Sequence, residues 1–246
     1  MRTGIFIASL VAIWAAASRS VDATLLPGPD EVLRALWANA RAGMLHRAVL
    51  KSLGRLALGY SISLTLGVTL GIALARVRAV KETLGALVLG LQALPSVCWL
   101  PLALLWFGLG EAAILTVVVL GSLLSVAVAT EGAVNSIPAV LLRAARTMGA
   151  EGIVLWRRVI LPAALPGVLS GARLGWTFAW RSLLAGELLF VSGGVGQVLE
   201  FGRELHDMAL VMGVMLVIVA LGLASDRLLF GLAEARVRRA WGLDRA

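Results

Sequence analysis

The 246-residue sequence contains little charge, since only 15% of its residues are Asp, Glu, Lys or Arg, whereas 60% are hydrophobic and the mean hydropathy is +0.94. A soluble domain of this length needs more polar surface to cover its core, so this composition excludes the soluble globular class. Lysine is scarce: only Lys51 and Lys81 are present, and neither belongs to a Gly-x4-Gly-Lys-Ser/Thr phosphate-binding loop. If ATP drives the activity of this protein, another chain must bind it.

Cysteine and histidine are also scarce. Cys98 is the single cysteine and stands in an apolar run, which excludes a disulfide framework or a cysteine metal site. His46 and His206 are isolated, and the sequence has neither an HExxH metal spacing nor a nucleophile–base motif, so we expect no metal site and no enzyme. An integral-membrane enzyme stays open only through residues that are distant in sequence. Residues 192–196 lack the third glycine and preceding strand of a dinucleotide fingerprint and predict a tight turn.

Long uncharged runs make up most of the sequence. About 20 apolar residues span a bilayer core as a helix, and several runs reach or approach that length. We therefore expect an all-α, polytopic membrane protein with residues 1–246 in one domain. The first run resembles a signal peptide, but we favour an uncleaved span because five spans would separate two basic regions across the membrane. The six expected transmembrane helices cover residues 4–18, 49–75, 83–107, 112–130, 168–190 and 208–230.

The net charge of +8 raises the possibility of nucleic-acid binding, but the basic residues gather at the ends of spans. They are concentrated in residues 76–81, 143–158 and 236–245, which the positive-inside rule assigns to the cytoplasm. Six spans then place both termini in the cytoplasm and leave no reason to expect a nucleic-acid partner. A fourth basic group disagrees with this orientation, and we interpret residues 25–45 as an interfacial helix on the outer side. That group consists of Arg34, Arg41, Arg47, Lys51 and Arg55.

Proline and small residues mark the interior of the expected bundle. Pro95 and Pro101 predict a kink in the third span, which should face the bundle interior because the freed carbonyls need partners. Gln92 lies close to this kink and is a candidate for lining a pore, with a bond to a neighbouring helix as an equal alternative. Small residues, glycine or alanine, recur at every fourth position in residues 67–75 and 167–179, which favours close helix packing within one subunit over packing across a dimer.

Three charged residues interrupt the fifth span: Arg173, Arg181 and Glu187. Each costs roughly 2.5–3.5 kcal/mol near the membrane centre, so exposure to lipid is excluded. We expect Arg173 to reach the cytoplasmic interface. Arg181 and Glu187 lie roughly 120° apart around a helix, so each needs a partner on another helix, water or a substrate. A guanidinium in a pore suits an anionic substrate, but a structural or gating role is favoured. A protonatable Glu187 would fit an ion-gradient-driven secondary transporter, our alternative reading.

A polar loop of residues 131–167 separates the fourth and fifth spans. Ser136 and Pro138 predict a helix start, and Gly149 predicts its end. Between them an apolar face combines Leu141, Ala144, Ala145 and Met148, with Arg143 and Arg146 turned away. A second helix over residues 152–160 should end at Leu161-Pro162. Physical reasoning alone leaves two equal alternatives, docking of another protein or binding to the membrane surface.

The spacing in this loop resembles the coupling-loop signature of bacterial ABC importer permeases. That pattern is Ala-Ala, three residues, Gly, nine residues, an aliphatic residue, any residue and Leu-Pro. It is matched at Ala144, Ala145, Gly149, Val159, Leu161 and Pro162. Residues 26–29, Ser52 with Arg55, and residues 101–110 and 180–189 resemble the nitrate, sulfonate, taurine and bicarbonate branch of the same family. The resemblance covers nearly the whole chain.

This resemblance implies a type I importer in the cell inner membrane. It is built from two copies of the permease, two cytoplasmic ATPase subunits and an extracytoplasmic solute-binding protein, surrounded by lipid. The permease itself binds no cofactor, because ATP and Mg²⁺ are held by the ATPase. It implies an import path for a small solute such as an organic anion, nitrate or bicarbonate, with Gln92, Pro95, Arg181 and Glu187 as candidates for its lining or gate.

The residues expected to contact the ATPase are Arg143, Ala144, Ala145, Arg146, Met148, Gly149, Glu151, Leu161 and Pro162. One of them departs from the family pattern, because Arg143 stands where the family usually has Glu. An ion pair made by that Glu cannot be transferred to this chain, and Glu151 is the nearest substitute carboxylate in the sequence.

Overall fold

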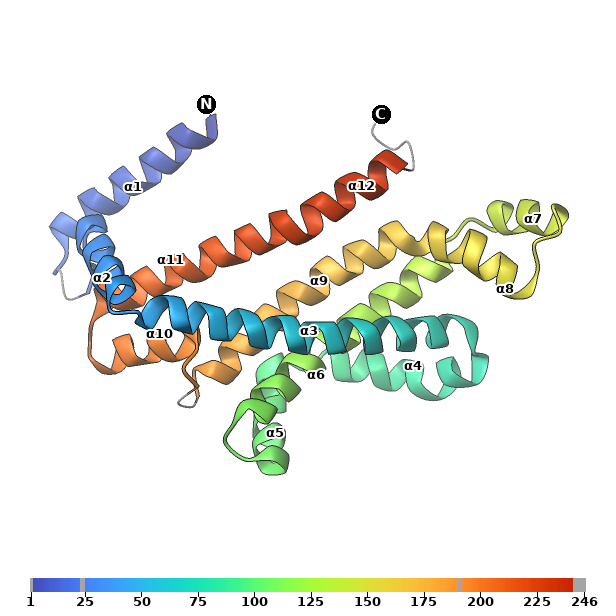
Figure 1. Cartoon of the computed structure of the whole chain (residues 1–246), viewed down its shortest axis with the longest axis horizontal. Coiled ribbons are helices and arrows are strands. Elements are labelled where there is room, and N and C mark those ends of the chain that lie inside the picture. Colours follow the sequence, from blue (N-terminus) through green and yellow to red (C-terminus); the bar gives the residue numbers. More distant parts are fainter. Residues whose placement is uncertain (1, 23–24, 190–191, 241–246) are drawn as a thin grey trace. The chain divides into compact units, whose positions relative to one another are not determined.

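The computed structural model describes residues 2–22, 25–189 and 192–240, and every regular element in this part of the chain is a helix. The all-α expectation is confirmed. The chain divides into two units, formed by residues 1–54 with 187–222 and by residues 55–186 with 223–246. Figure 1 shows the helices along the chain.

The first unit contains three complete helices, the start of a fourth and most of a fifth. Its core is apolar: Ala48 packs with Val195 and Val198, and with Leu210 and Val214. The short helix α2 exposes Leu33 and Trp37 while its Val32 is buried, so it has the two-sided character expected of an interfacial helix. The helices of this unit are α1 (Arg2–Ser20), α2 (Pro29–Arg41), α3 (Met44–Arg76, up to Gly54), α10 (Val195–Glu204) and α11 (Met208–Ser225, up to Gly222).

The second unit is built around helix α6. Half of the residues in the most apolar stretch of this helix are buried. Beside α6 it contains the remainder of α3 and a series of helices that follow one another along the chain. These are α4 (Arg78–Gln92), the 3-10 turn η1 (Ser96–Trp99), α5 (Leu100–Phe107), α6 (Glu111–Asn135), α7 (Ala139–Thr147), α8 (Gly152–Leu155), the π-turn η2 (Trp156–Ile160), α9 (Leu161–Glu187), the π-turn η3 (Asp226–Gly231) and α12 (Leu232–Ala240).

Glycines bring α3 and α9 close to α6 within the second unit. A Cβ atom on Gly67 would lie 2.8 Å from the Leu123 carbonyl oxygen on α6. A Cβ atom on Gly167 of α9 would lie 2.6 Å from the Cβ of Ala133. Gly71, Gly171 and Gly175 meet α6 in the same way. The repeated glycines therefore pack helices of one subunit together, as the favoured interpretation expected.

Four helices are long and apolar enough to cross a membrane, and they correspond to the second, fourth, fifth and sixth expected spans. The first expected span is shorter, with an apolar stretch over Gly4–Ser20. The number of spans is four, or five if one bent pair of helices counts as a single span, so the expectation of six is not reproduced among the described residues. The expected end of the fifth span at residue 190 lies outside the described residues.

The third expected span is the bent pair. Arg78–Gln92 and Ser96–Phe107 meet at an angle of 107°, so the expected kink is a complete break of the helix. Pro95 explains the position of the break, because it lacks an N–H group and disfavours helical backbone at the residue before it. Pro101 lies in the first turn of α5, where proline is tolerated and causes no kink.

Candidate functional site

The short helix α7 of the loop ends in a well-defined backbone motif. The Gly149 N–H donates to the Arg146 carbonyl at 2.9 Å, and the Ala150 N–H donates to the Ala145 carbonyl at 3.0 Å. These two bonds form a Schellman motif, with Gly149 in the left-handed region at φ +81°. The expected helix stop at Gly149 is therefore confirmed. The expected helix start at Ser136 is wrong, because Ser136 caps the C-terminal end of α6 and α7 begins after Pro138.

The loop has a small apolar core of its own. Ala145, Leu155 and Ile160 are buried together, and Leu142, Ala150 and Trp156 pack against them. The expected apolar face of α7 is therefore divided. Its Ala145 faces this core, whereas Leu141, Ala144 and Met148 remain exposed.

The expected end of the second loop helix at Leu161-Pro162 is wrong. The helix continues from Gly152 to Glu187 through α8, η2 and α9. The Leu161 N–H donates to the Trp156 carbonyl, five residues back, which is the bonding of a π-turn. A wider turn just before Pro162 leaves room for the proline ring, which clashes with the carbonyl four residues back in a regular α-helix. Leu161 and Pro162 thus lie inside a helix, and the first segment of the fifth span starts in the loop.

Exposed apolar side chains cover α7 and the start of α8. The exposed fractions are 66% for Val140, 87% for Met148 and 71% for Ile153. We call Val140, Leu141, Met148 and Ile153 the coupling surface. The Schellman motif and the small core hold the backbone beneath it, so this surface is a fixed one.

Arg143 and Arg146 are exposed on α7, and Glu151 is exposed immediately before α8. Within the described residues, Arg143 makes no salt bridge, and Glu151 does not pair with it. The Glu151 carbonyl instead accepts the first backbone bonds of α8, from Val154 and Leu155. Glu151 is thus exposed beside the loop, and its role as a substitute for the family's usual Glu stays a prediction.

The loop of residues 131–167 is joined to α3 and to α4. The Arg76 guanidinium at the end of α3 lies 4.0 Å from the centre of the Trp156 ring, a cation–π contact. Lys81 near the start of α4 forms a 2.8 Å salt bridge with Glu131 near the end of α6. Two of the basic regions assigned to the cytoplasm therefore meet at one end of the second unit.

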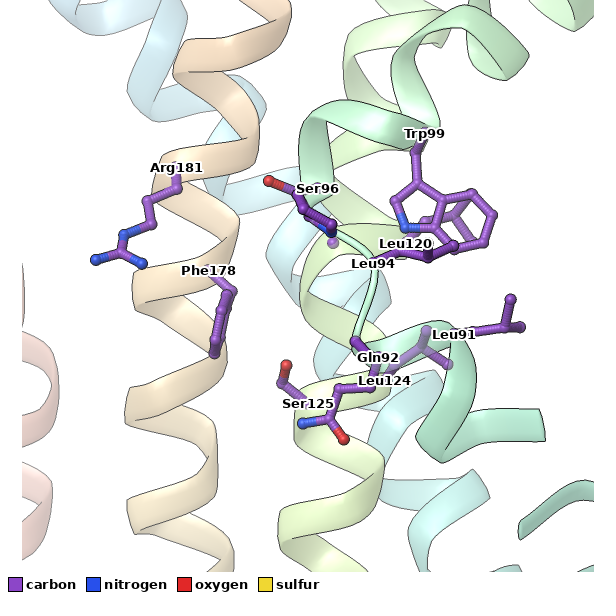
Figure 2. A pocket seen from close by; sticks show the side chains of 13 residues that line it. Leu91, Gln92, Leu94, Ser96, Trp99, Leu120, Leu124, Ser125, Phe178 and Arg181 are labelled. Atoms are coloured by element: carbon purple, nitrogen blue, oxygen red, sulfur yellow. The ribbon is translucent and has the colours of Figure 1, made fainter. Parts of the chain in front are cut away.

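A pocket of about 260 Å³ lies at the broken third span of the same unit. Three of the four candidates for the import path line it, namely Gln92, Pro95 and Arg181. Ser96 and Ser125 add hydroxyl groups to the lining, and Figure 2 shows the Gln92 amide beside Ser125.

Arg181 reaches this pocket from α9, one turn after Phe178. Figure 2 shows its guanidinium directed away from the side of the pocket where Gln92 and Trp99 lie. Arg181 is exposed, and it has no salt bridge within the described part of the chain. The pocket therefore has uncharged polar groups, those of Gln92, Ser96 and Ser125, and one positive charge, that of Arg181.

Glu187, the fourth candidate, belongs to the first unit and does not line this pocket. It is fully buried, and the Ser52 hydroxyl donates to its carboxylate, at 2.8 and 2.7 Å from the two oxygens. The Gly196 N–H also donates to it at 3.0 Å, and the Val195 N–H donates to the Ser52 hydroxyl at 2.8 Å. The carboxylate therefore satisfies the N-terminus of α10, where negative charge is favoured.

The expected position of Arg173 at the cytoplasmic interface stays a prediction, and the structure adds two acidic partners for its side chain. Arg173 forms a bidentate ion pair with Asp226, at 2.6 and 2.5 Å, and a longer one with Glu234 at 3.3 Å. The Trp176 indole donates to the Ser225 hydroxyl one turn later, at 3.2 Å. These partners are about 50 to 60 residues apart in sequence, with separations of 49, 53 and 61, so no local spacing signals them.

Comparison with known proteins identifies the family. Residues 67–241 match the family model described as the binding-protein-dependent transport system inner membrane component. The chain is 31% identical to the aliphatic sulfonates transport permease protein SsuC of Escherichia coli, over 88% of this chain and 83% of that protein. It is also 31% identical to the taurine transport system permease protein TauC of Escherichia coli, over 80% and 74%. The riboflavin transport system permease protein RibX of Chloroflexus aurantiacus is 31% identical, over 86% and 79%.

Among solved structures, the inward-facing MetNI methionine ABC transporter has a chain with the same fold. Its TM-score is 0.67 at 24% sequence identity, and the match covers 80% of this chain and 95% of that one. The family match and the fold agree with the resemblance that begins at Ala144, Ala145 and Gly149. The chain belongs to the binding-protein-dependent transport system inner membrane components and is the inner-membrane permease subunit of an ABC importer, a transport protein rather than an enzyme.

Proposed function

We propose that the coupling surface is where this permease receives the movement of a cytoplasmic ATPase. The observation that supports this proposal is the exposed apolar cover on α7 and α8, held by a Schellman motif and a small core. A fixed apolar patch outside the membrane spans suits a protein partner. Arg143, Arg146 and Glu151 border this patch and would make polar contacts at its rim, while Ala144 and Gly149 leave room for close approach. Leu161 and Pro162 lie in the continuous helix that leads from the patch into the fifth span.

The proposed assembly contains two copies of this permease, two ATPase subunits that hold ATP and Mg²⁺, and an extracytoplasmic solute-binding protein. Both termini lie in the cytoplasm. The basic regions at residues 76–81 and 143–158 meet at one end of the second unit, which supports a common cytoplasmic side. ATP binding would favour one arrangement of the spans and hydrolysis the other.

We propose a small organic anion, such as a sulfonate, as the imported solute, with nitrate or bicarbonate as smaller members of the same charge class. Two relatives carry names that refer to sulfonates and taurine, whereas RibX is named for riboflavin at the same identity. The pocket lined by Gln92, Pro95 and Arg181 is the proposed part of the import path. Glu187 is proposed to support the path structurally, through α10.

Met148 offers the sharpest test of the coupling surface, because its side chain is 87% exposed and its replacement removes little packing within the permease. We expect Met148→Asp to abolish co-purification with the ATPase and ATP-driven uptake, because a charge would be buried unpaired in the interface. Met148→Leu, which keeps the surface apolar, should retain both. An unchanged complex with Met148→Asp would refute the proposed contact.

The anion assignment has its own test at Arg181. We expect Arg181→Ala to lower uptake of a sulfonate more than Arg181→Lys, because lysine retains the charge. If Arg181→Ala retains uptake with an unchanged substrate preference, Arg181 does not take part in substrate recognition. The coupling surface would not be affected by that result.

A further inference from the structure

A second pocket, of about 420 Å³, lies in the first unit, beside the turn between α2 and α3 and against α10. Its volume falls within the range of roughly 300–1,000 Å³ that is usual for small-molecule sites. The pocket involves none of the residues assigned to the coupling surface or the import path. Its lining consists of Ala42, Met44, Arg47, Ala48, Gly193, Gln197, Val198 and Phe201.

The polar side chains in this lining present hydrogen-bond donors. Arg47 carries a permanent positive charge and five N–H donors. The Oε1 atom of Gln197 accepts the Gly193 N–H, so the remaining hydrogen-bonding group of that side chain is its NH2 donor. No Asp or Glu lines the pocket. Such a set of groups favours an anion.

The Arg47 side chain lies beside the turn that precedes α3. Gly43 has a φ of +78° in the turn before α3, and a Cβ atom there would lie 3.6 Å from Nη2 of Arg47. Within the described residues, Arg47 forms no salt bridge. The ammonium group of Lys51, one turn further along α3, lies 3.2 Å from the position of a Cβ atom on Gly193. The Gly193 turn therefore has the Lys51 ammonium on one side, and the buried Glu187 carboxylate lies against the following residue, Gly194.

The remaining walls are apolar. Met44, Ala48, Val198 and Phe201 surround the donors, and Ala48 and Val198 also belong to the core of the unit. An inorganic anion such as nitrate would leave these walls in contact with water. An anion that carries a short hydrocarbon group would cover them and gain from the burial, at roughly 25 cal/mol per Å² of apolar area.

We propose that this pocket binds a small organic anion with a short apolar chain, its head on Arg47 and Gln197 and its chain against Met44, Val198 and Phe201. It adjoins the turn after α2, the helix that the sequence places on the outer side of the membrane. It would therefore meet the solute on the outer side. This inference rests on the proposed substrate class, to which it adds a separate outer binding step.

The test uses the full chain in nanodiscs of phosphatidylcholine, titrated with 1-pentanesulfonate by calorimetry. We expect saturable binding that Arg47→Ala weakens by about tenfold or more, as is usual for loss of a charged hydrogen-bond partner. Arg47→Lys should retain part of the affinity. The matched control is Arg34→Ala, which removes an exposed arginine of α2 that does not line this pocket. Phe201→Ser should weaken pentanesulfonate more than methanesulfonate, because only the longer chain reaches the apolar wall.

Several results would overturn the proposal. They are absence of saturable binding, equal binding by wild type and Arg47→Ala, and Arg47-dependent binding of phosphatidylglycerol without binding of pentanesulfonate. The last result would make the occupant a lipid headgroup. Met148→Asp separates this proposal from the coupling contact, since it should leave pentanesulfonate binding unchanged while the ATPase is lost. If pentanesulfonate does not bind while sulfonate uptake is normal, the outer site is refuted and the proposed substrate class is retained.

Discussion

In the first unit, the buried carboxylate of Glu187 leaves no space for a side chain at Gly194. The Glu187 carboxylate lies against the Cα atom of Gly194, so closely that a Cβ atom on that glycine would overlap all three carboxylate atoms. Burial of this charge is tolerable because Ser52 and the N-terminus of α10 donate to it. Gly194 is required there for space, since its φ of −94° is available to any residue.

We predict that Gly194→Ala lowers the stability of the permease by about 1–3 kcal/mol, the usual cost of overpacking. Gly54→Ala is the matched control, because Gly54 lies in α3 with nothing within 4 Å of an added Cβ atom. Alanine should stabilise the helix there by about 0.5–1 kcal/mol. Thermal unfolding in detergent would measure both changes. An unaltered unfolding temperature for Gly194→Ala would contradict the close contact between Gly194 and the Glu187 carboxylate.

At this scale, the sequence allowed local roles to be predicted and left distant partners undetermined. The stop at Gly149 followed from the nearby residues, because a Schellman motif involves only six consecutive positions. The partners of Glu187 did not, since Ser52 is 135 residues away. The charges inside this apolar span indicated that each needs a partner. The fold identifies Ser52 and α10 as the partners of Glu187, whereas Arg181 is exposed and forms no salt bridge within the described residues.

Among the elements, the continuous helix from Gly152 to Glu187 differs most from the sequence expectation. Leu-Pro was expected to end a helix, because proline lacks an N–H group and clashes with the preceding turn. The π-turn Trp156–Ile160 removes that conflict by widening the helix before Pro162. Apolar periodicity does not reveal such an adjustment, whereas the positions of the break at Pro95 and of four spans were available from composition.

We predict that Pro162→Ala allows the π-turn to relax toward regular α-helix and changes the orientation of α8 relative to α9. The complex with the ATPase should persist, because the coupling surface is intact, while uptake per ATP hydrolysed should fall several-fold. Pro166→Ala, in the same helix but without an adjacent π-turn, is the control. Uptake and ATP hydrolysis in proteoliposomes would measure the ratio, and equal ratios in both variants would argue against a role for the π-turn.

For the whole molecule, the orientation in the membrane decides which surface meets which partner. We propose that the coupling surface faces the cytoplasm and that α2 lies on the outer side. The sequence predicted this from the positions of basic residues, yet Arg34, Arg41 and Arg47 disagree with the positive-inside rule. The proposed role of Arg47 in binding an anion would explain why one of these charges is placed there.

We predict opposite labelling of two single cysteines introduced after Cys98→Ser, which removes the one native cysteine. Trp37→Cys on α2 should react with a membrane-impermeant maleimide in whole cells. Met148→Cys should react only in inside-out vesicles, since both native side chains are well exposed, at 62% and 87%. Labelling of both from the same side would exclude the proposed topology, and unmodified Cys98→Ser reports background.

The helix that starts at Gly152 contains 36 residues and so extends about 54 Å. One end carries Ile153 of the coupling surface, and the other ends at Glu187, whose carboxylate seats the first turn of α10. A push applied by the ATPase at Ile153 would therefore act on the same continuous helix that carries Arg181 to its pocket. The stiffness of the helix between these two residues would set how much of a movement at the loop reaches that pocket.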